Sequence, residues 1–151
     1  MRRTIAWCSA AGWLLVAAYA LAEDRYFIGL PSGGTGNWSE ASNWTGATLP
    51  QPGDAAWIAS DDPFDRVVTL DADVSVGTLT IGNTGGGLTT LYQNGEFDLT
   101  SSSEVLGYGW IAPPGSEWLP NSRGAHVQNG GTNTVESLML GDYNSYLFEP
   151  A

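Results

Sequence analysis

The most constraining feature of the sequence is a short motif that occurs twice, with a weaker third copy between. Val76-x-x-Leu79-x-Ile81-Gly82 has the spacing and character of Val135-x-x-Leu138-x-Leu140-Gly141, and a degenerate copy ends at Val105-Leu106-Gly107. The glycines that end the copies are separated by 25 and 34 residues. Internal periods of roughly 20 to 50 residues are typical of solenoids, propellers and repeat arrays. The unequal spacing predicts coils joined by loops of different length.

Each copy reads as a short strand with one apolar face. An Asn-Gly turn signal at Asn94-Gly95 and a glycine cluster at residues 85–87 separate such strands. A strand of this kind cannot bury its apolar face alone, so successive coils must stack to form a continuous core. At about 20 to 25 residues per coil, residues 67–151 predict three to four turns of a β-solenoid. The alternative for any single copy is an ordinary sandwich strand that ends in a turn.

The first 22 residues have the pattern of a cleaved signal peptide. MRR supplies positive charge, residues 5–19 are apolar, and Ala20-Leu21-Ala22 matches a signal peptidase site, so cleavage is expected before Glu23. The alternative is an uncleaved anchor, but the apolar run is shorter than the roughly 20 residues that span a bilayer. Cys8 is the single cysteine. The mature chain is therefore expected to lack disulfides and thiolate metal sites.

The mature chain is strongly acidic. It keeps Arg25, Arg66 and Arg123 against 16 acidic residues, a formal charge of 3 − 16 = −13, and it has no lysine. Nucleic acids and anionic membranes require clustered positive charge, so neither is an expected partner, and no membrane insertion of the mature chain is expected. Extracellular polysaccharide and other surface proteins are the candidate partners. Twenty glycines and few long helix formers favour strands and turns over helices.

Residues 23–66 are predicted to form a tryptophan-rich N-terminal cap. Trp38 and Trp44 lie in two Asn-Trp pairs, and Trp57 with Ile58 is expected to begin the first inward strand. The open first coil of a solenoid needs a cover for its apolar interior and its unpaired edge, which favours the cap. Two alternatives remain: a sugar-binding platform made by Trp38, Trp44 and Trp57, or glycosylation of the sequons at Asn37 and Asn43.

Five aspartates are candidate ligands for Ca²⁺, the one cofactor that the sequence offers: Asp61, Asp62, Asp65, Asp71 and Asp73. Asp71 and Asp73 are expected on the same face of a strand. No EF-hand or RTX-type spacing is present, so a solvated acidic edge that resists aggregation is the favoured interpretation.

No catalytic constellation is predicted, and the protein is not expected to be an enzyme. His126 lies between two expected inward residues, Ala125 and Val127, so alternation predicts that it faces solvent. It has no second histidine or cysteine with which to bind a transition metal. A polysaccharide lyase needs a basic residue to take a proton and cations to neutralise the carboxylate of its substrate, and only Arg66 and Arg123 are candidates for these roles. A glycosidase would need two carboxyl groups about 5 to 10 Å apart across a cleft.

The order of these motifs carries a family resemblance. Five features follow one another along the sequence: an Asn-Trp entry segment, a proline with Gly-Asp, Trp57-Ile58, VTLDADVSVGTLTIG and QNGGTNTVESLMLG. In this order they resemble bacterial exported and surface proteins with autotransporter-type β-strand repeats, which are often associated with a PEP-CTERM sorting signal. The resemblance covers roughly residues 33–141. It implies a right-handed parallel β-helix and export to the periplasm, cell surface or extracellular space, and such proteins mostly lack an assigned biochemical activity. We expect a structural or adhesive scaffold. A polysaccharide-binding module is the alternative, and a β-helix lyase or glycosidase fragment is the third.

The sequence departs from that family pattern at its C-terminal end. It stops at LGDYNSYLFEPA, without a further repeat set, a sorting tail or a translocating barrel. The repeats are therefore expected to be truncated, and anchoring to the cell surface is not carried over.

Overall fold

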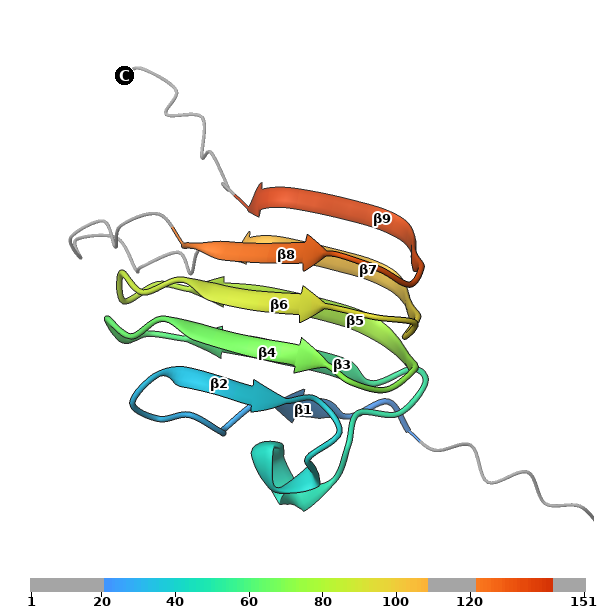
Figure 1. Ribbon diagram of the computed structural model, residues 1–151, viewed down its shortest axis with the longest axis horizontal. Coiled ribbons are helices and arrows are strands. Elements are labelled where there is room, and N and C mark those ends of the chain that lie inside the picture. The colour runs from blue at the N-terminus through green and yellow to red at the C-terminus, as the bar shows by residue number, and fades with distance from the viewer. Residues whose placement is uncertain (1–20, 109–121, 143–151) are drawn as a thin grey trace, which may run out of the picture.

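The described part of the protein is built from two parallel sheets. The computed structural model describes residues 21–108 and 122–142. One sheet has the order β1 (Asp24–Tyr26), β3 (Ala55–Ser60), β5 (Val74–Asn83), β7 (Leu99–Tyr108) and β9 (Asn133–Asp142). The other has the order β2 (Gly34–Asn37), β4 (Arg66–Leu70), β6 (Thr89–Gln93) and β8 (Gly124–Gln128). Two short 3-10 helices, η1 (Ala41–Asn43) and η2 (Thr45–Ala47), lie at the β1–β2 end (Figure 1).

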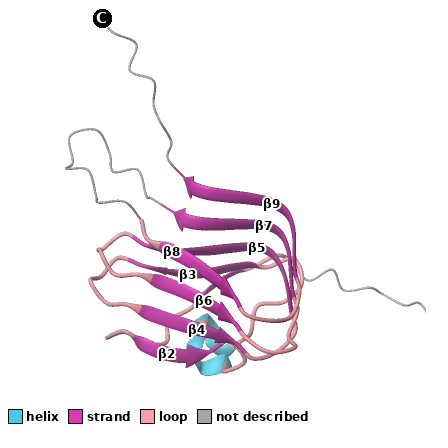
Figure 2. Cartoon of the chain, turned by 45° about the horizontal axis from the view of Figure 1, so that its top comes forward, coloured by secondary structure: helices cyan, strands magenta, loops and turns pink. Residues whose placement is uncertain are grey.

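The polypeptide passes alternately from one sheet to the other. Each strand pairs in parallel with the strand two places earlier, so every coil adds one strand to each sheet (Figures 1 and 2). The prediction of an all-β fold is thereby confirmed. The two sheets are flat and face each other rather than tracing a clear β-helix, because each coil within the described residues contributes only two strands.

The register aligns the three copies of the sequence motif. We call residues that the register aligns from strand to strand a column. One column holds Leu79, Glu104 and Leu138, and another holds Ile81, Leu106 and Leu140. The middle copy is degenerate in the sequence because Glu104 stands in the leucine column and Ser101 in the column of Val76 and Val135.

The hydrophobic core lies between the sheets, and stacking begins earlier than the sequence predicted. Strands β1, β2 and β3 all precede residue 67, the expected start of the repeats. Strand β3 is expected from Trp57-Ile58, whereas the short polar β1 and the glycine-rich β2 lack the alternation by which a strand is recognised. Phe27, Trp38 and Trp44 join the same cluster as the later strands, whose other members are Ala56, Ile58, Val68, Leu70, Val74, Val76, Leu79, Ile81, Leu91 and Leu99.

Strand β5 changes its inward face at Gly77. Val74 and Val76 are buried before this glycine, and Leu79 and Ile81 are buried after it, so the inward positions shift by one residue. A Cβ atom at Gly77 would lie 2.6 Å from the carbonyl oxygen of Gly53. The main-chain N–H of Gly77 donates to the carbonyl oxygen of Asp54 (2.8 Å). Gly77 therefore lets the strand bend against the preceding coil without ending it.

The last strand leaves apolar side chains uncovered. Leu138, Met139 and Leu140 of β9 are 52%, 46% and 67% exposed, whereas Leu79 in the same column as Leu138 is 0% exposed. Strand β9 is the outer strand of its sheet. Within residues 21–108 and 122–142, no helix has the length and apolar character needed to cross a membrane. Residues 1–20 of the predicted signal peptide lie outside the described residues.

Candidate functional site

The chemically richest cluster lies inside the stack, around His126 of β8. The register pairs His126 with Leu91 of β6, an inward residue, and its side chain is 6% exposed. Val127, expected to point inward, is 43% exposed. The prediction that His126 faces solvent is therefore wrong. Alternation along β8 has the opposite phase because polar partners inside the core accommodate the imidazole.

Four polar side chains from four strands form this cluster, which we call the polar layer: Gln93, Glu104, His126 and Asn133. The Nδ1 atom of His126 lies 2.6 Å from Oε1 of Glu104, and its Nε2 lies 3.1 Å from Oε1 of Gln93. Asn133 Nδ2 donates to the other oxygen of Glu104 at 3.0 Å. Glu104 is almost completely buried. The polar layer thus ties β6, β7, β8 and β9 together.

The orientation of Gln93 determines which protons the layer holds. Its Nε2 donates to the carbonyl oxygens of Phe97 (2.8 Å) and Thr132 (3.0 Å), so its Oε1 is left as an acceptor toward His126. His126 Nε2 must therefore carry a hydrogen. A second proton joins Nδ1 to Glu104, because a carboxylate and an unprotonated nitrogen would both be acceptors. The pair shares this proton and is neutral as a whole.

The ionised form of Glu104 is favoured by its partners. Burial raises the pKa of Glu104, but the hydrogen bonds from His126 and Asn133 and the charge of His126 outweigh burial and hold it below its ordinary value. Both imidazole nitrogens are engaged, so His126 is not available as a general base. Ser101 also faces the core from β7, and its Oγ has no partner among the described residues. The arrangement is suited to joining strands rather than to nucleophilic chemistry.

Aspartates link successive coils at the turns. Asp73 accepts from the N–H of Asp98 (3.0 Å), and Asp98 accepts from the N–H of Thr132 (2.7 Å). Asp71 accepts from the N–H of Ser39 (2.9 Å) and Asp65 from that of Leu88 (2.7 Å). Asp54 accepts from the N–H of Glu23 (2.9 Å). We call this set the coil-linking aspartates: Asp54, Asp65, Asp71, Asp73 and Asp98. Each satisfies a main-chain donor of a neighbouring coil that strand pairing leaves free.

The five predicted calcium candidates are not brought together. Asp65, Asp71 and Asp73 belong to the coil-linking aspartates, and the last two lie between β4 and β5 rather than on one strand. Asp62 pairs with Arg66, whose guanidinium holds the pKa of that carboxyl below its ordinary value. Asp61 is exposed. In the described ranges, no three histidine, cysteine, aspartate or glutamate side chains are placed to hold a metal ion.

The three tryptophans named from the sequence have two different environments. Trp38 and Trp44 are buried against each other with ring centroids 4.7 Å apart, and Trp44 Nε1 donates to the carbonyl of Trp38 (2.9 Å). Trp44 also makes an edge contact with Phe27. Trp57 lies on the outer face of β3, stacked on Tyr26, with Ile58 pointing inward. Stacking on a sugar requires an open ring face, which neither Trp38 nor Trp44 offers.

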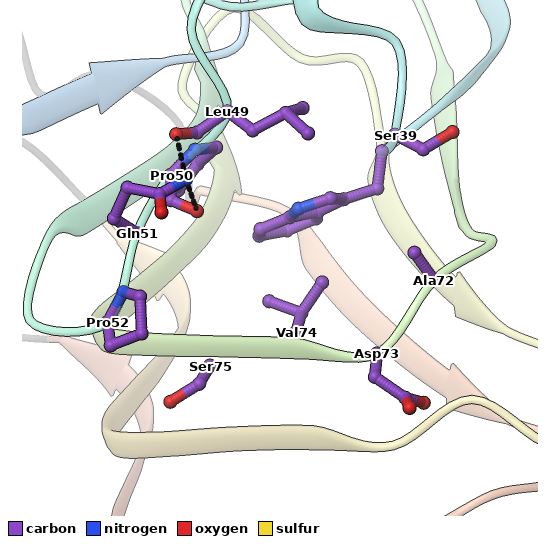
Figure 3. Close-up of a pocket in the computed structure, with 10 residues that line it drawn as sticks. Ser39, Leu49, Pro50, Gln51, Pro52, Ala72, Asp73, Val74 and Ser75 are labelled. Atoms are coloured by element: carbon purple, nitrogen blue, oxygen red, sulfur yellow. Dashed lines mark hydrogen bonds between the residues drawn. The ribbon is translucent and has the colours of Figure 1, made fainter.

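A small depression lies beside Trp38, with a volume of about 290 Å³. Its walls come from Trp38 and Ser39, from residues 49–52 and from residues 72–75 (Figure 3). Leu49, Pro50 and Pro52 make one side apolar. Asp73 and Ser75 lie at its edge, with side chains on the opposite side of the strand from Val74 (Figure 3).

The comparisons with known proteins add no assignment, since no protein-family model, curated protein or solved structure matches the sequence. The polar layer was missed in the sequence, although one signal points to it. The tripeptide Gln-Asn-Gly occurs at residues 93–95 and again at residues 128–130. Aligning these tripeptides places His126 in the column of Leu91, which is the register observed.

Proposed function

We propose that the protein is an exported structural or adhesive scaffold of the bacterial cell surface or extracellular matrix, without catalysis. In this proposal residues 1–22 are a signal peptide, and the two-sheet stack is a short right-handed parallel β-helix capped by Trp38 and Trp44. The motif order that resembles autotransporter-type repeats supports the proposal. Its partners would be other surface proteins or extracellular polysaccharide.

One observation supports the proposal. The ionisable side chains that could take part in chemistry are engaged in holding coils together. The coil-linking aspartates each accept a main-chain N–H from another coil. The buried guanidinium of Arg66 contacts Asp62, Ser60 Oγ (2.7 Å) and the carbonyl of Leu30 (3.0 Å). Both nitrogens of His126 are likewise engaged. Groups fixed in this way give rigidity to a stack, which is what a scaffold requires.

The scaffold proposal is tested by following the full-length protein in a bacterium with a working secretion pathway. Cell fractionation should recover the protein outside the cytoplasm, and mass spectrometry should find Glu23 as its first residue. Beads coated with the purified product should then adhere to cells or to isolated matrix. Cytoplasmic protein that still begins with MRRT, or coated beads that bind no better than uncoated ones, would contradict the proposal.

A polysaccharide-binding module is the second candidate, and the depression beside Trp38 is the observation that favours it. Its apolar wall offers the kind of surface on which a sugar ring packs, and the polar residues Asp73 and Ser75 lie at its edge. Affinity electrophoresis in gels containing neutral polysaccharides distinguishes the two candidates. A binding module should be retarded, and Ser75→Trp, which places a bulky ring at the edge of the depression, should weaken the retardation. Thr100→Trp is the matched control, because Thr100 is aligned with Ser75 one coil away and is outside the depression.

A further inference from the structure

Two identical tripeptides occupy equivalent turns of successive coils. Strands β6 and β8 pair with Gln93 opposite Gln128, so Asn94 and Asn129 follow at the same level of the stack. Each asparagine precedes a glycine. A glycine has no side chain to hinder its own nitrogen, so the Asn-Gly sequence is where the main chain most readily attacks an asparagine side chain.

The fold restrains one of these asparagines. The Asn129 side-chain amide donates to the hydroxyl of Tyr92 at 3.0 Å, and its main-chain N–H donates to the carbonyl of Gln93 at 2.8 Å. Gly130 packs directly on the preceding turn, because a Cβ atom there would lie 2.2 Å from the carbonyl oxygen of Gly95. Movement of this turn toward a cyclic intermediate would break these contacts.

The other asparagine is unrestrained. Asn94 is exposed, and its side chain has no hydrogen-bond partner in residues 21–108 and 122–142. Gly95 is exposed as well, with a left-handed φ of 85°, and a Cβ atom added there would meet no other atom within 4 Å. The two turns pack on each other through Gly95 and Gly130, so what distinguishes them is the asparagine side chain, which is free at Asn94 and held at Asn129.

We propose that Asn94 is a site of spontaneous modification, at which the folded protein converts asparagine to aspartate and isoaspartate, while the structure protects Asn129. The main-chain nitrogen of Gly95 attacks Cγ of Asn94, and the bond between Cγ and Nδ2 breaks. The leaving nitrogen takes up the proton of the Gly95 amide and departs as ammonia. Solvent water then adds to either carbonyl of the five-membered imide and breaks one ring C–N bond, leaving a carboxylate and a released proton.

The modification would change the turn that directly follows Gln93 of the polar layer. An isoaspartate inserts one methylene into the main chain directly after Gln93, whose side chain donates to Phe97 and Thr132 and accepts from His126. Either product also places a new carboxylate in the column of Asp71, in a turn that already holds Glu96 and Asp98. The charge and the main-chain length of this turn would therefore change with the age of the protein.

The test is to incubate the purified full-length protein at neutral to mildly alkaline pH and to follow both tripeptides by peptide mass spectrometry. Water labelled with oxygen-18 should leave one labelled oxygen in each converted residue. The rate at Asn94 should exceed that at Asn129 by about fivefold or more, the factor that one hydrogen bond of ordinary net strength provides. Equal rates in the folded protein, or a faster reaction at Asn129, would overturn the proposal.

Two comparisons separate the fold from the local sequence. In denaturant the two rates should become similar, because the tripeptides are identical. Tyr92→Phe removes the hydroxyl that restrains Asn129 and keeps the ring, so the rate at Asn129 should rise while the rate at Asn94 stays the same. A difference between the sites that persists in denaturant would show that the turns are not distinguished by the fold. An unchanged rate at Asn129 in the Tyr92→Phe variant would contradict the role assigned to the Tyr92 hydroxyl.

Discussion

At the scale of single residues, Glu104 has the most consequences. It occupies a column that is leucine in the coils on both sides, and it is buried there with a histidine as its partner. A buried ion pair recovers little more than the cost of removing its charges from water, so its main effect is on which arrangement of strands is stable. Glu104 and His126 meet only if β7 and β8 each keep the observed register with the neighbouring strands of their own sheets.

We predict strong coupling between the two residues of this pair. His126→Leu leaves a buried carboxylate without its main partner, which should reduce the free energy of unfolding by about 3 to 5 kcal/mol. The double variant Glu104→Leu with His126→Leu restores the leucines found one coil earlier, Leu79 and Leu91. Its stability in urea unfolding should match or exceed that of the unchanged protein. Losses that simply add would contradict the described geometry.

The low pKa of Glu104 predicts a loss of stability in acid. A carboxyl group whose pKa is lower in the folded state contributes stability above its unfolded pKa, about 4.5, and this contribution is lost as the pH falls through the folded value. Glu104→Gln removes this titration and keeps the size of the side chain. The free energy of unfolding of the unchanged protein should therefore fall more steeply than that of the variant below about pH 4.5. Parallel curves would show that Glu104 is not held in the ionised form.

At the scale of strands, the column that contains Leu79 and Leu138 shows how position in the stack determines how much a leucine contributes to the free energy of unfolding. Leu79→Ala should reduce the free energy of unfolding by about 2 to 5 kcal/mol, because the leucine is fully buried. Leu138→Ala in the same column should change it by less than about 0.5 kcal/mol, because this leucine is half exposed. Thermal or urea unfolding of both variants measures the difference, and a large loss for Leu138→Ala would mean that β9 is covered.

The strand scale also shows what could be predicted from sequence. The repeat at Val76 and Val135 predicted which residues stack, because apolar spacing and glycine position are both written in the sequence. The facing of His126 was not predictable from local alternation, since its burial depends on Glu104 and Gln93, which are distant in sequence. The coil-linking role of Asp73 was hidden for the same reason: its partner, the N–H of Asp98, lies 25 residues away.

At the scale of the whole molecule, the two ends of the stack differ. The β1–β2 end is closed by Phe27, Trp38 and Trp44, which are buried. The β9 end exposes leucines and a strand edge. The tryptophan end also has outer strands, β1 and β2, so the uncovered leucines are what set the β9 end apart. Exposed edges promote pairing with other polypeptides, and association of the protein should therefore favour the β9 end.

The central claim is that successive coils stack in parallel with one fixed register, and disulfide cross-linking measures this directly. With Cys8 replaced by serine, cysteine pairs are placed in the column of Val67, Thr90 and Ala125. Adjacent strands lie about 4.8 Å apart, within the Cα separation of about 4.4 to 6.8 Å that a disulfide requires. The pairs at 67 and 90 and at 90 and 125 should therefore oxidise readily, whereas the pair at 67 and 125, two strands apart, should not. Rapid oxidation of the 67–125 pair, or none of the adjacent pairs, would contradict the stacked arrangement.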